Sequence, residues 1–217
     1  MQFKAVCFDL DGTFLNSLTD IGYCTNKILL SRGLPSHSLK KIRGFLGSGL
    51  RHLVTSSLPQ EYRYEKIIQE FIKDFEKTYR NNLFKNTTPY KGIPELLYEL
   101  RRKKIKLTIL SNKPQKFTSL SVKRLLPNWE FESVIGLRDG FPKKPDTRGF
   151  ALIKKKLQLK SKEFLFVGDT EIDIKTAIKA NCFPVGVLWG FSSKKTLKDN
   201  GARAIIKKPL ELLDIIK

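Results

Sequence analysis

Short apolar runs alternate along the chain with stretches in which apolar residues recur every three or four positions. The runs predict buried strands, and they cover residues 3–8, 105–110, 131–135, 163–167, 183–188 and 202–206. The periodic stretches predict helices. Beyond residue 92, helices are expected at residues 93–100, 114–126 and 150–157. Two more are expected, one ending near residue 180 and one at the end of the chain.

This alternation indicates the fold class. A strand, a helix and a further strand form a parallel pair through a right-handed crossover, and repeated units of this kind give the α/β class. Residues 17–86 are the exception, because their apolar spacing is helical throughout. We therefore predict a doubly wound, Rossmann-like parallel sheet from residues 1–16 and 87–217. A small all-helical domain, residues 17–86, is inserted after strand one. Ser17-Leu-Thr-Asp20 resembles a capping box at its start.

Polar side chains follow four of the predicted strands at the points where those strands end. In an open parallel sheet the ligand crevice lies at the carboxyl ends of the strands. These side chains are therefore expected to meet in one crevice. They are Asp9, Asp11, Ser111, Asn112, Lys144, Asp169 and Asp173.

The acids in this set predict a metal ion. Four clustered carboxylates, those of Asp9, Asp11, Asp169 and Asp173, repel one another and resist ionising together. A divalent cation removes this conflict. Because the set offers oxygen ligands and no His or Cys, it favours a hard ion, and Mg²⁺ is the expected one.

The remaining groups predict a phosphate ligand. The Ser111 hydroxyl, the Lys144 ammonium and the loop N–H groups suit a phosphate, and together with the metal they indicate phosphoryl transfer. One carboxylate can accept the phosphoryl group. A second acid two residues further on, as in Asp9-Leu-Asp11, can protonate the departing oxygen and later deprotonate water.

Four motifs resemble those of the haloacid dehalogenase-like (HAD) superfamily of hydrolases. They are DLDGT at 9–13, SNK at 111–113, KP at 144–145 and GDTEID at 168–173. The helical insert is similar to the cap of the phosphoglycolate phosphatase-like branch. The resemblance implies that Asp9 is the nucleophile and forms an aspartyl-phosphate. It implies that Asp11 is the general acid/base and lends its backbone carbonyl to Mg²⁺, and that Asp169 is the third protein ligand.

The same resemblance assigns the residues around the phosphoryl group. Ser111 and Lys144 would hold it, with Asn112 and the Gly12 backbone nearby, while Asp173 would orient metal-bound water. A glycine loop of the cap, residues 46–51, would lie over the site, with Arg51 gripping a substrate anion such as a carboxylate. Alternatives stay open at this point. Ser111 could cap a helix, Lys143 could replace its neighbour, Asp173 could serve the helix dipole, and Arg51 could be a surface residue.

The leading hypothesis is a Mg²⁺-dependent phosphatase for a small phosphomonoester, with 2-phosphoglycolate as the first guess. A phosphomutase or a pyrophosphatase on the same scaffold is the alternative, and Asp11 argues against a dehalogenase. A different class, a nucleic-acid-binding protein, is suggested by the net charge of +20. Because the basic residues form short clusters with few aromatic residues among them, a solvated surface is favoured and nucleic acid is not the expected partner.

Composition sets the remaining expectations. The chain has 217 residues with 41% hydrophobic and 29% charged residues, which is ordinary for a globular protein. No apolar run is long enough to span a membrane and no secretion signal is visible, so a cytoplasmic monomer or homodimer is expected. Cys7, Cys24 and Cys182 are odd in number and are expected to be buried thiols.

Overall fold

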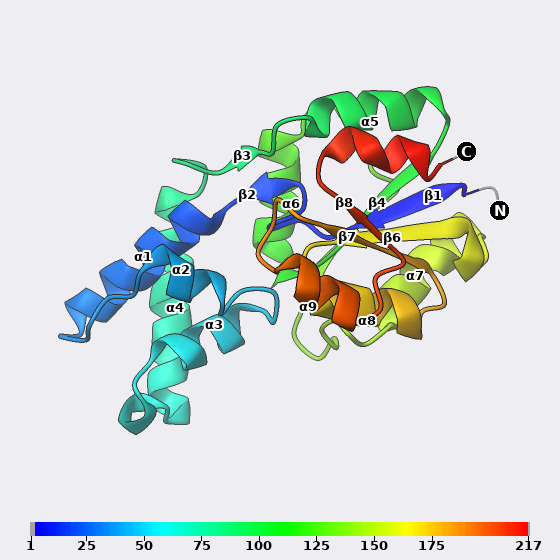
Figure 1. Ribbon diagram of the computed structural model, residues 1–217. Helices are drawn as coiled ribbons and strands as arrows, with labels where there is room; N and C mark the ends of the chain where they lie inside the picture. Colours follow the sequence, from blue (N-terminus) through cyan, green and yellow to red (C-terminus); the bar gives the residue numbers. More distant parts are fainter. Residues whose placement is uncertain (1–2, 217) are drawn as a thin grey trace.

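The computed structural model describes residues 3–216 and contains a six-stranded sheet (Figure 1). The strands stand in the order β5-β4-β1-β6-β7-β8, and every neighbouring pair is parallel. The predicted doubly wound parallel sheet is therefore confirmed. The strands are β1 (Ala5–Phe8), β4 (Lys106–Pro114), β5 (Ser133–Leu137), β6 (Phe164–Gly168), β7 (Phe183–Val187) and β8 (Ala204–Ile206).

Helices cover both faces of this sheet. Successive strand residues point to opposite faces, and because β1 is apolar at every position, both of its faces must be buried. Val6 and Phe8 belong to the apolar cluster beneath α5, whereas Ala5 and Cys7 belong to the cluster beneath α7 and α8 (Figure 1). The first face also carries α6 and η3, and the second carries α9. The bounds are α5 (Ile93–Arg102), α6 (Gln115–Leu125), α7 (Arg148–Leu157), η2 (Ser161–Glu163), α8 (Glu171–Lys179), α9 (Lys194–Asp199) and η3 (Pro209–Asp214).

The helices from Leu18 to Asn82 form a second body, the cap, beside the sheet (Figure 1). It has its own apolar core, to which Phe117 of α6 also belongs. A short antiparallel ribbon of β2 (Leu15–Asn16) and β3 (Thr88–Pro89) joins the chain where it leaves and re-enters the sheet. The exact domain boundaries stay a prediction. The helices are α1 (Leu18–Ser31), α2 (Leu39–Arg43), α3 (Leu50–Ser57), η1 (Gln60–Tyr62) and α4 (Glu65–Asn82).

The capping box expected at Ser17 and Asp20 is wrong. Ser17 stands at the N-cap of α1, but its side chain makes no capping hydrogen bond. The Asp20 carboxylate instead accepts hydrogen bonds from the backbone and side chain of Asn86 (2.9–3.1 Å) and from the backbone and hydroxyl of Thr87 (2.9 and 2.6 Å). Asp20 therefore ties the outgoing connection of the helical body to the returning one.

Three element predictions differ from the structure. Strand β4 extends four residues beyond the predicted end at Leu110, because its polar continuation also pairs within the buried sheet. Helix α9 was not predicted, since Leu197 is its one buried apolar residue. The last helix is a 3₁₀ helix, η3, rather than an α-helix.

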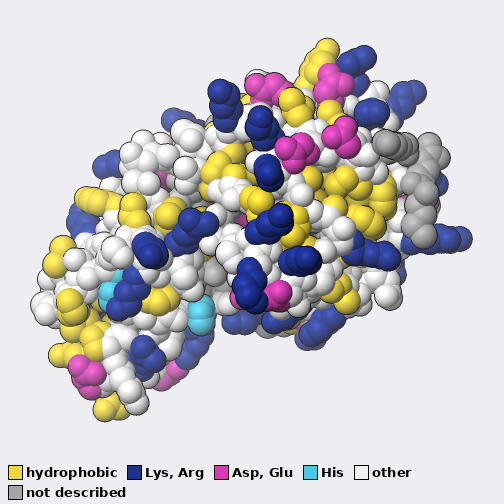
Figure 2. Space-filling view, in the orientation of Figure 1, with side chains coloured by type: hydrophobic (Ala, Val, Ile, Leu, Met, Phe, Trp, Pro, Cys, Tyr) yellow, Lys and Arg dark blue, Asp and Glu magenta, His cyan; other side chains and the backbone are white. Residues whose placement is uncertain are grey.

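The surface and the cysteines complete the description. Figure 2 shows Lys and Arg side chains spread over both bodies on this face, with Asp and Glu side chains among them. That nucleic acid is not a partner stays a prediction. Cys7, Cys24 and Cys182 are buried free thiols, as predicted. Within residues 3–216, no helix has the length and apolar character that crossing a membrane requires.

Candidate active site

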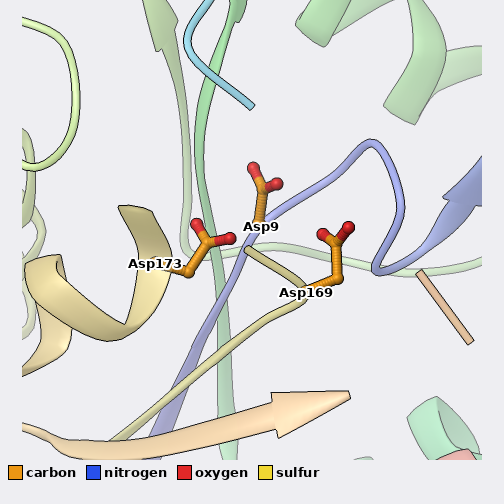
Figure 3. Close-up of side chains that lie close together, drawn as sticks. All are labelled: Asp9, Asp169 and Asp173. Carbon is orange, nitrogen blue, oxygen red and sulfur yellow. The ribbon is translucent and has the colours of Figure 1, made fainter. Parts of the chain in front are cut away.

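Three carboxylates meet at the carboxyl ends of β1 and β6 (Figure 3). Asp9 directly follows β1, Asp169 follows β6, and Asp173 lies in the first turn of α8. Each offers an oxygen within 4.8 Å of the other two, and each side chain is almost completely buried. The parallel sheet thus brings together three of the four predicted acids. The fourth acid, Asp11, is not part of this cluster and pairs with Lys113 instead.

Lys144 is the buried cation of this cluster. Its ammonium donates to Asp173 Oδ1 at 2.6 Å and forms an ion pair with Asp9 Oδ1 at 2.8 Å. Burial alone would lower the pKa of Lys144, but Asp173 and Asp9 raise it above its ordinary value. Lys143, the other candidate, is exposed and donates to the Ser48 carbonyl at 3.1 Å. Lys144 is therefore the lysine of this motif that reaches the acids.

Asp169 is fixed from both sides. Thr13 Oγ1 donates to its Oδ1 at 3.0 Å, and the Phe191 N–H donates to its Oδ2 at 2.8 Å. Gly12 has a φ of +86°, and a Cβ at this position would lie 2.2 Å from Asp169 Oδ2. Only glycine allows the chain after β1 to approach Asp169 this closely. Gly12 therefore shapes the site through its backbone.

The electrostatics of the cluster fit a divalent cation. Burial, with the nearby Asp173 charge acting in the same direction, raises the pKa of Asp9 to about 6 against the opposing effect of Lys144. Burial and the charges of Asp173 and Asp9 raise the pKa of Asp169 well above its ordinary value. Both shifts arise because crowded buried carboxylates have too little positive charge beside them. Oxygen donors of this kind select a hard ion such as Mg²⁺.

Asp173, a member of the cluster, also binds groups outside it. Its Oδ1 accepts from Lys144, and its Oδ2 accepts from the Thr170 N–H at 3.0 Å and the Thr170 hydroxyl at 2.7 Å. With Thr170 as N-cap, this forms the capping box of α8. Asp169 lies just before that N-cap rather than inside the helix, so the two acids do not share a helix face.

Asp11 pairs with Lys113, a residue to which the sequence analysis gave no role. The Lys113 ammonium donates to both carboxylate oxygens of Asp11 at 3.0 Å and to the Tyr79 hydroxyl at 2.8 Å. Burial alone would lower the pKa of Lys113, but Asp11 and Tyr79 raise it above its ordinary value. Burial raises the pKa of Tyr79 to about 12, so its hydroxyl is neutral. A cap residue thus touches the lysine that holds Asp11.

Ser111 and Asn112 stand at the end of β4 with different roles. Ser111 is buried, and its Oγ accepts from the Lys113 N–H at 3.3 Å, which leaves its hydroxyl proton free to meet a phosphate. It does not cap α6, whose N-cap is Pro114. The Asn112 amide donates to the carbonyls of Gly47 and Lys144 and accepts from the Lys144 N–H. Asn112 therefore holds loops together and has no side-chain donor left for a phosphate.

A cavity of about 70 Å³ lies between the two bodies, over Asp9 and Asp11. The predicted glycine loop contributes Leu46, Gly47 and Gly49 to its wall. Its lining is mostly apolar, and Lys113 is the one cationic residue among the residues of the described chain that line it. The other lining residues are Ile21, Leu50, Leu53, Phe75, Tyr79, Ser111, Asn112, Pro114, Phe117 and Phe191.

The structure does not bring Arg51 into this cavity. Arg51 follows Leu50 on α3, and one helical position turns its side chain away from the face on which Leu50 lines the cavity. Its guanidinium pairs with Glu65 on the exposed surface of the cap. We therefore do not carry Arg51 forward as a substrate ligand.

Another arginine, Arg43 at the end of α2, joins the cap to the sheet. Its guanidinium donates to the carbonyls of Gly190 and Phe191. The N–H of Phe191 in turn holds Asp169. Arg43, Lys113, Tyr79 and Thr13 are the site residues that sequence reasoning missed. Strand alternation could have revealed Lys113, because it lies two positions after Ser111 on β4.

The fold and the site define an α/β protein whose acidic centre lies at the carboxyl edge of a doubly wound sheet. The model of the haloacid dehalogenase-like hydrolase family matches residues 6–187. The chain therefore belongs to the haloacid dehalogenase-like hydrolases, and the resemblance seen in the four motifs is confirmed.

Individual relatives match over nearly the whole chain. A phosphoglycolate phosphatase of Photobacterium profundum is 28% identical and covers 99% of this chain and 96% of its own length. One of Chromobacterium violaceum is 29% identical, with coverage of 100% and 97%. A structure described as a predicted phosphoglycolate phosphatase of Haemophilus somnus superposes with a TM-score of 0.92 at 27% identity, covering 100% of this chain and 99% of its own. A haloacid dehalogenase-like hydrolase of Streptococcus pneumoniae gives 0.88 at 26%, with 99% coverage of each.

Proposed function

We propose that the protein is a Mg²⁺-dependent phosphatase that hydrolyses a small phosphomonoester through a phosphorylated Asp9. The observation that carries this proposal is the buried cluster of Asp9, Asp169 and Asp173, in which Asp9 and Asp173 pair with the Lys144 ammonium. Carboxylates are rarely buried together unless cations accompany them. A cavity with room for a small leaving group lies directly above the cluster.

Each residue has a defined task in this reaction. Asp9 and Asp169, with the backbone carbonyl of Asp11, would hold Mg²⁺, which when bound supplies positive charge to the phosphate oxygens. Asp9 attacks the phosphorus, the bond from phosphorus to the leaving oxygen breaks, and the electron pair stays on that oxygen. Lys144 and the Ser111 hydroxyl stabilise the negative charge on the phosphoryl oxygens. Water then attacks the same phosphorus and releases Asp9.

Asp11 serves both halves of the reaction as the proton carrier. In the first half its proton passes to the leaving oxygen, and in the second half it accepts a proton from the attacking water. Asp11 lines the cavity, whereas Asp169 and Asp173 do not, so of these three acids it is the one beside the space for the leaving group.

The first candidate substrate is 2-phosphoglycolate, which the names of the relatives support. The apolar lining of the cavity favours a second candidate, a phosphomonoester with an uncharged alkyl leaving group, because burying a carboxylate among apolar side chains is costly. Isobutyl phosphate has nearly the shape of 2-phosphoglycolate without its carboxylate. A higher kcat/KM for 2-phosphoglycolate would support the first candidate, and a higher value for isobutyl phosphate the second.

Substitution of Asp9 tests the reaction itself. Asp9→Asn is expected to lower phosphate release more than about a hundredfold while leaving the fold intact. Asp199→Asn, an exposed acid on α9, is the matched control and should retain full activity. Acid-quenched wild-type enzyme should carry phosphate on the peptide that contains Asp9. Turnover by Asp9→Asn above about one hundredth of the wild-type rate would contradict covalent catalysis. Activity that needs a bisphosphate primer, or that is confined to pyrophosphate, would favour the mutase or the pyrophosphatase instead.

A further inference from the structure

Tyr79 is a buried cap residue whose hydroxyl is not explained by packing. Its ring stacks on Phe75 with centroids 5.2 Å apart and meets Phe117 edge-on at 5.2 Å. A phenylalanine would make the same ring contacts. The hydroxyl lies at the end of this aromatic stack and accepts a hydrogen bond from Lys113. This hydrogen bond joins α4 of the cap to β4 of the sheet.

The Lys113 ammonium is fully occupied by three acceptors. A lysine has three N–H donors, and the three here go to the two oxygens of Asp11 and to the Tyr79 hydroxyl. Lys113 is buried and also lies over the Tyr79 ring, 4.8 Å from its centroid. Three fixed acceptors define the orientation of the ammonium. With one of them lost, the ammonium can rotate about its stem and the Asp11 carboxylate can turn with it.

We propose that Tyr79 is a positioning residue that acts through Lys113 to fix the carboxylate of Asp11. This inference rests on the proposed function, in which Asp11 carries the proton. In the described chain the Tyr79 hydroxyl is hydrogen-bonded to the Lys113 ammonium and reaches Asp11 through it. Because Tyr79 is contributed by the cap, Asp11 is held in its place only when the cap lies against the sheet as it does here.

The consequence is a link between cap position and proton transfer. When the phosphorus–oxygen bond breaks, the leaving oxygen takes the electron pair and the Asp11 proton. A misplaced Asp11 delays this transfer, and the delay is largest for basic leaving oxygens, which depend most on protonation. Weakly basic leaving groups depart with less help. Tyr79 should therefore matter most for basic leaving groups.

The experiment compares Tyr79→Phe with wild type on substituted phenyl phosphates. These substrates have nearly one shape and differ in the basicity of the leaving oxygen. The kcat/KM value reports the first half-reaction up to departure of the leaving group. We expect kcat/KM of Tyr79→Phe to fall about tenfold for phenyl phosphate and less than about twofold for 4-nitrophenyl phosphate. Tyr23→Phe, at an exposed cap tyrosine on α1, is the matched control and should behave as wild type.

A double-mutant cycle with Asp11→Asn separates positioning from a general structural effect. The cycle is measured with phenyl phosphate, on which Tyr79→Phe alone is expected to cost about tenfold. If Tyr79 acts through Asp11, Tyr79→Phe has no further effect on the residual phenyl phosphatase activity of Asp11→Asn. An equal loss in both backgrounds, or an unchanged dependence on leaving-group basicity, would overturn the proposal. The thermal midpoint of Tyr79→Phe shows that the variant is folded at the assay temperature.

A failure of this proposal can be told apart from a failure of the proposed function. If phosphoryl transfer to Asp9 is wrong, acid-quenched wild-type enzyme carries no phosphate on the peptide that contains Asp9, whatever Tyr79→Phe does. If only the positioning role is wrong, that peptide carries phosphate while Tyr79→Phe matches wild type across the phenyl phosphates.

Discussion

Replacing Lys144 by methionine tests whether its ammonium is what allows three carboxylates to stay buried together. Methionine keeps most of the side-chain volume and removes the charge. In the structure the ammonium lies 2.6 Å from Asp173 and 2.8 Å from Asp9, and Lys144 is only 3% exposed. Water therefore cannot take over the role of the missing cation without opening the site.

The expected loss follows from these distances. At an effective dielectric constant of about 20, each contact represents about 6 kcal/mol of gross attraction. Much of this is offset by the desolvation of the ammonium, and removal of one partner of a buried ion pair costs about 3–5 kcal/mol. For a chain of this size about 1 kcal/mol corresponds to about 2–4 °C in the unfolding midpoint. Lys144→Met should therefore unfold about 6–20 °C below wild type.

The assay is thermal unfolding followed by circular dichroism at neutral pH in EDTA. Lys143→Met is the matched control, because the neighbouring lysine is exposed, and its free energy of unfolding should stay within about 0.5 kcal/mol of wild type. Combining Lys144→Met with Asp173→Asn should cost less than the sum of the two single changes, because Asp173→Asn removes a charge that the first change leaves unpaired. Strict additivity within about 0.5 kcal/mol would refute the reasoning.

Two further predictions concern the connections of the cap. Hydrogen bonds from residues 86 and 87 outweigh the effect of burial and hold the pKa of Asp20 below its ordinary value of 3.8. A lowered pKa stabilises the fold above about pH 4, and this stability is lost as the pH falls through the folded-state pKa. Asp20→Asn should therefore lower the free energy of unfolding by about 1–3 kcal/mol at neutral pH. Urea unfolding at several pH values should show that acidification changes the stability of this variant less than that of wild type. Parallel curves of stability against pH would show that Asp20 is not responsible. Arg43→Ala removes the hydrogen bonds of Arg43 between the cap and the loop after β7. KM for 2-phosphoglycolate should therefore rise about three- to tenfold, which corresponds to the free energy of about one hydrogen bond. Arg51→Ala, at an exposed arginine, is the control and should leave this KM unchanged. A rise for Arg51→Ala alone would restore Arg51 as a substrate ligand.

Much of the fold could be predicted because the relevant patterns are local. Strand alternation and helical periodicity repeat within a few residues, so the strands, most helices and the helical insert were visible in the sequence. The capping box at Ser17 failed because a carboxylate near a helix start has other possible partners. Here Asp20 accepts hydrogen bonds from Asn86 and Thr87, which lie 66 and 67 positions away. Helix α9 was missed because a short surface helix with one buried leucine carries little periodic signal.

The sequence by itself determined which chemical groups the site contains. Only the tertiary structure decided which of these side chains contact one another. Four motifs at strand ends determined the acidic centre, because parallel strands bring their carboxyl ends to one edge. Which acids pair with which lysines depended on packing between residues far apart. Lys113 lies 102 positions from Asp11 and 34 from Tyr79, yet its ammonium joins both. Arg51 turned outward for the same reason, since the face a helix buries is set by what lies beneath it.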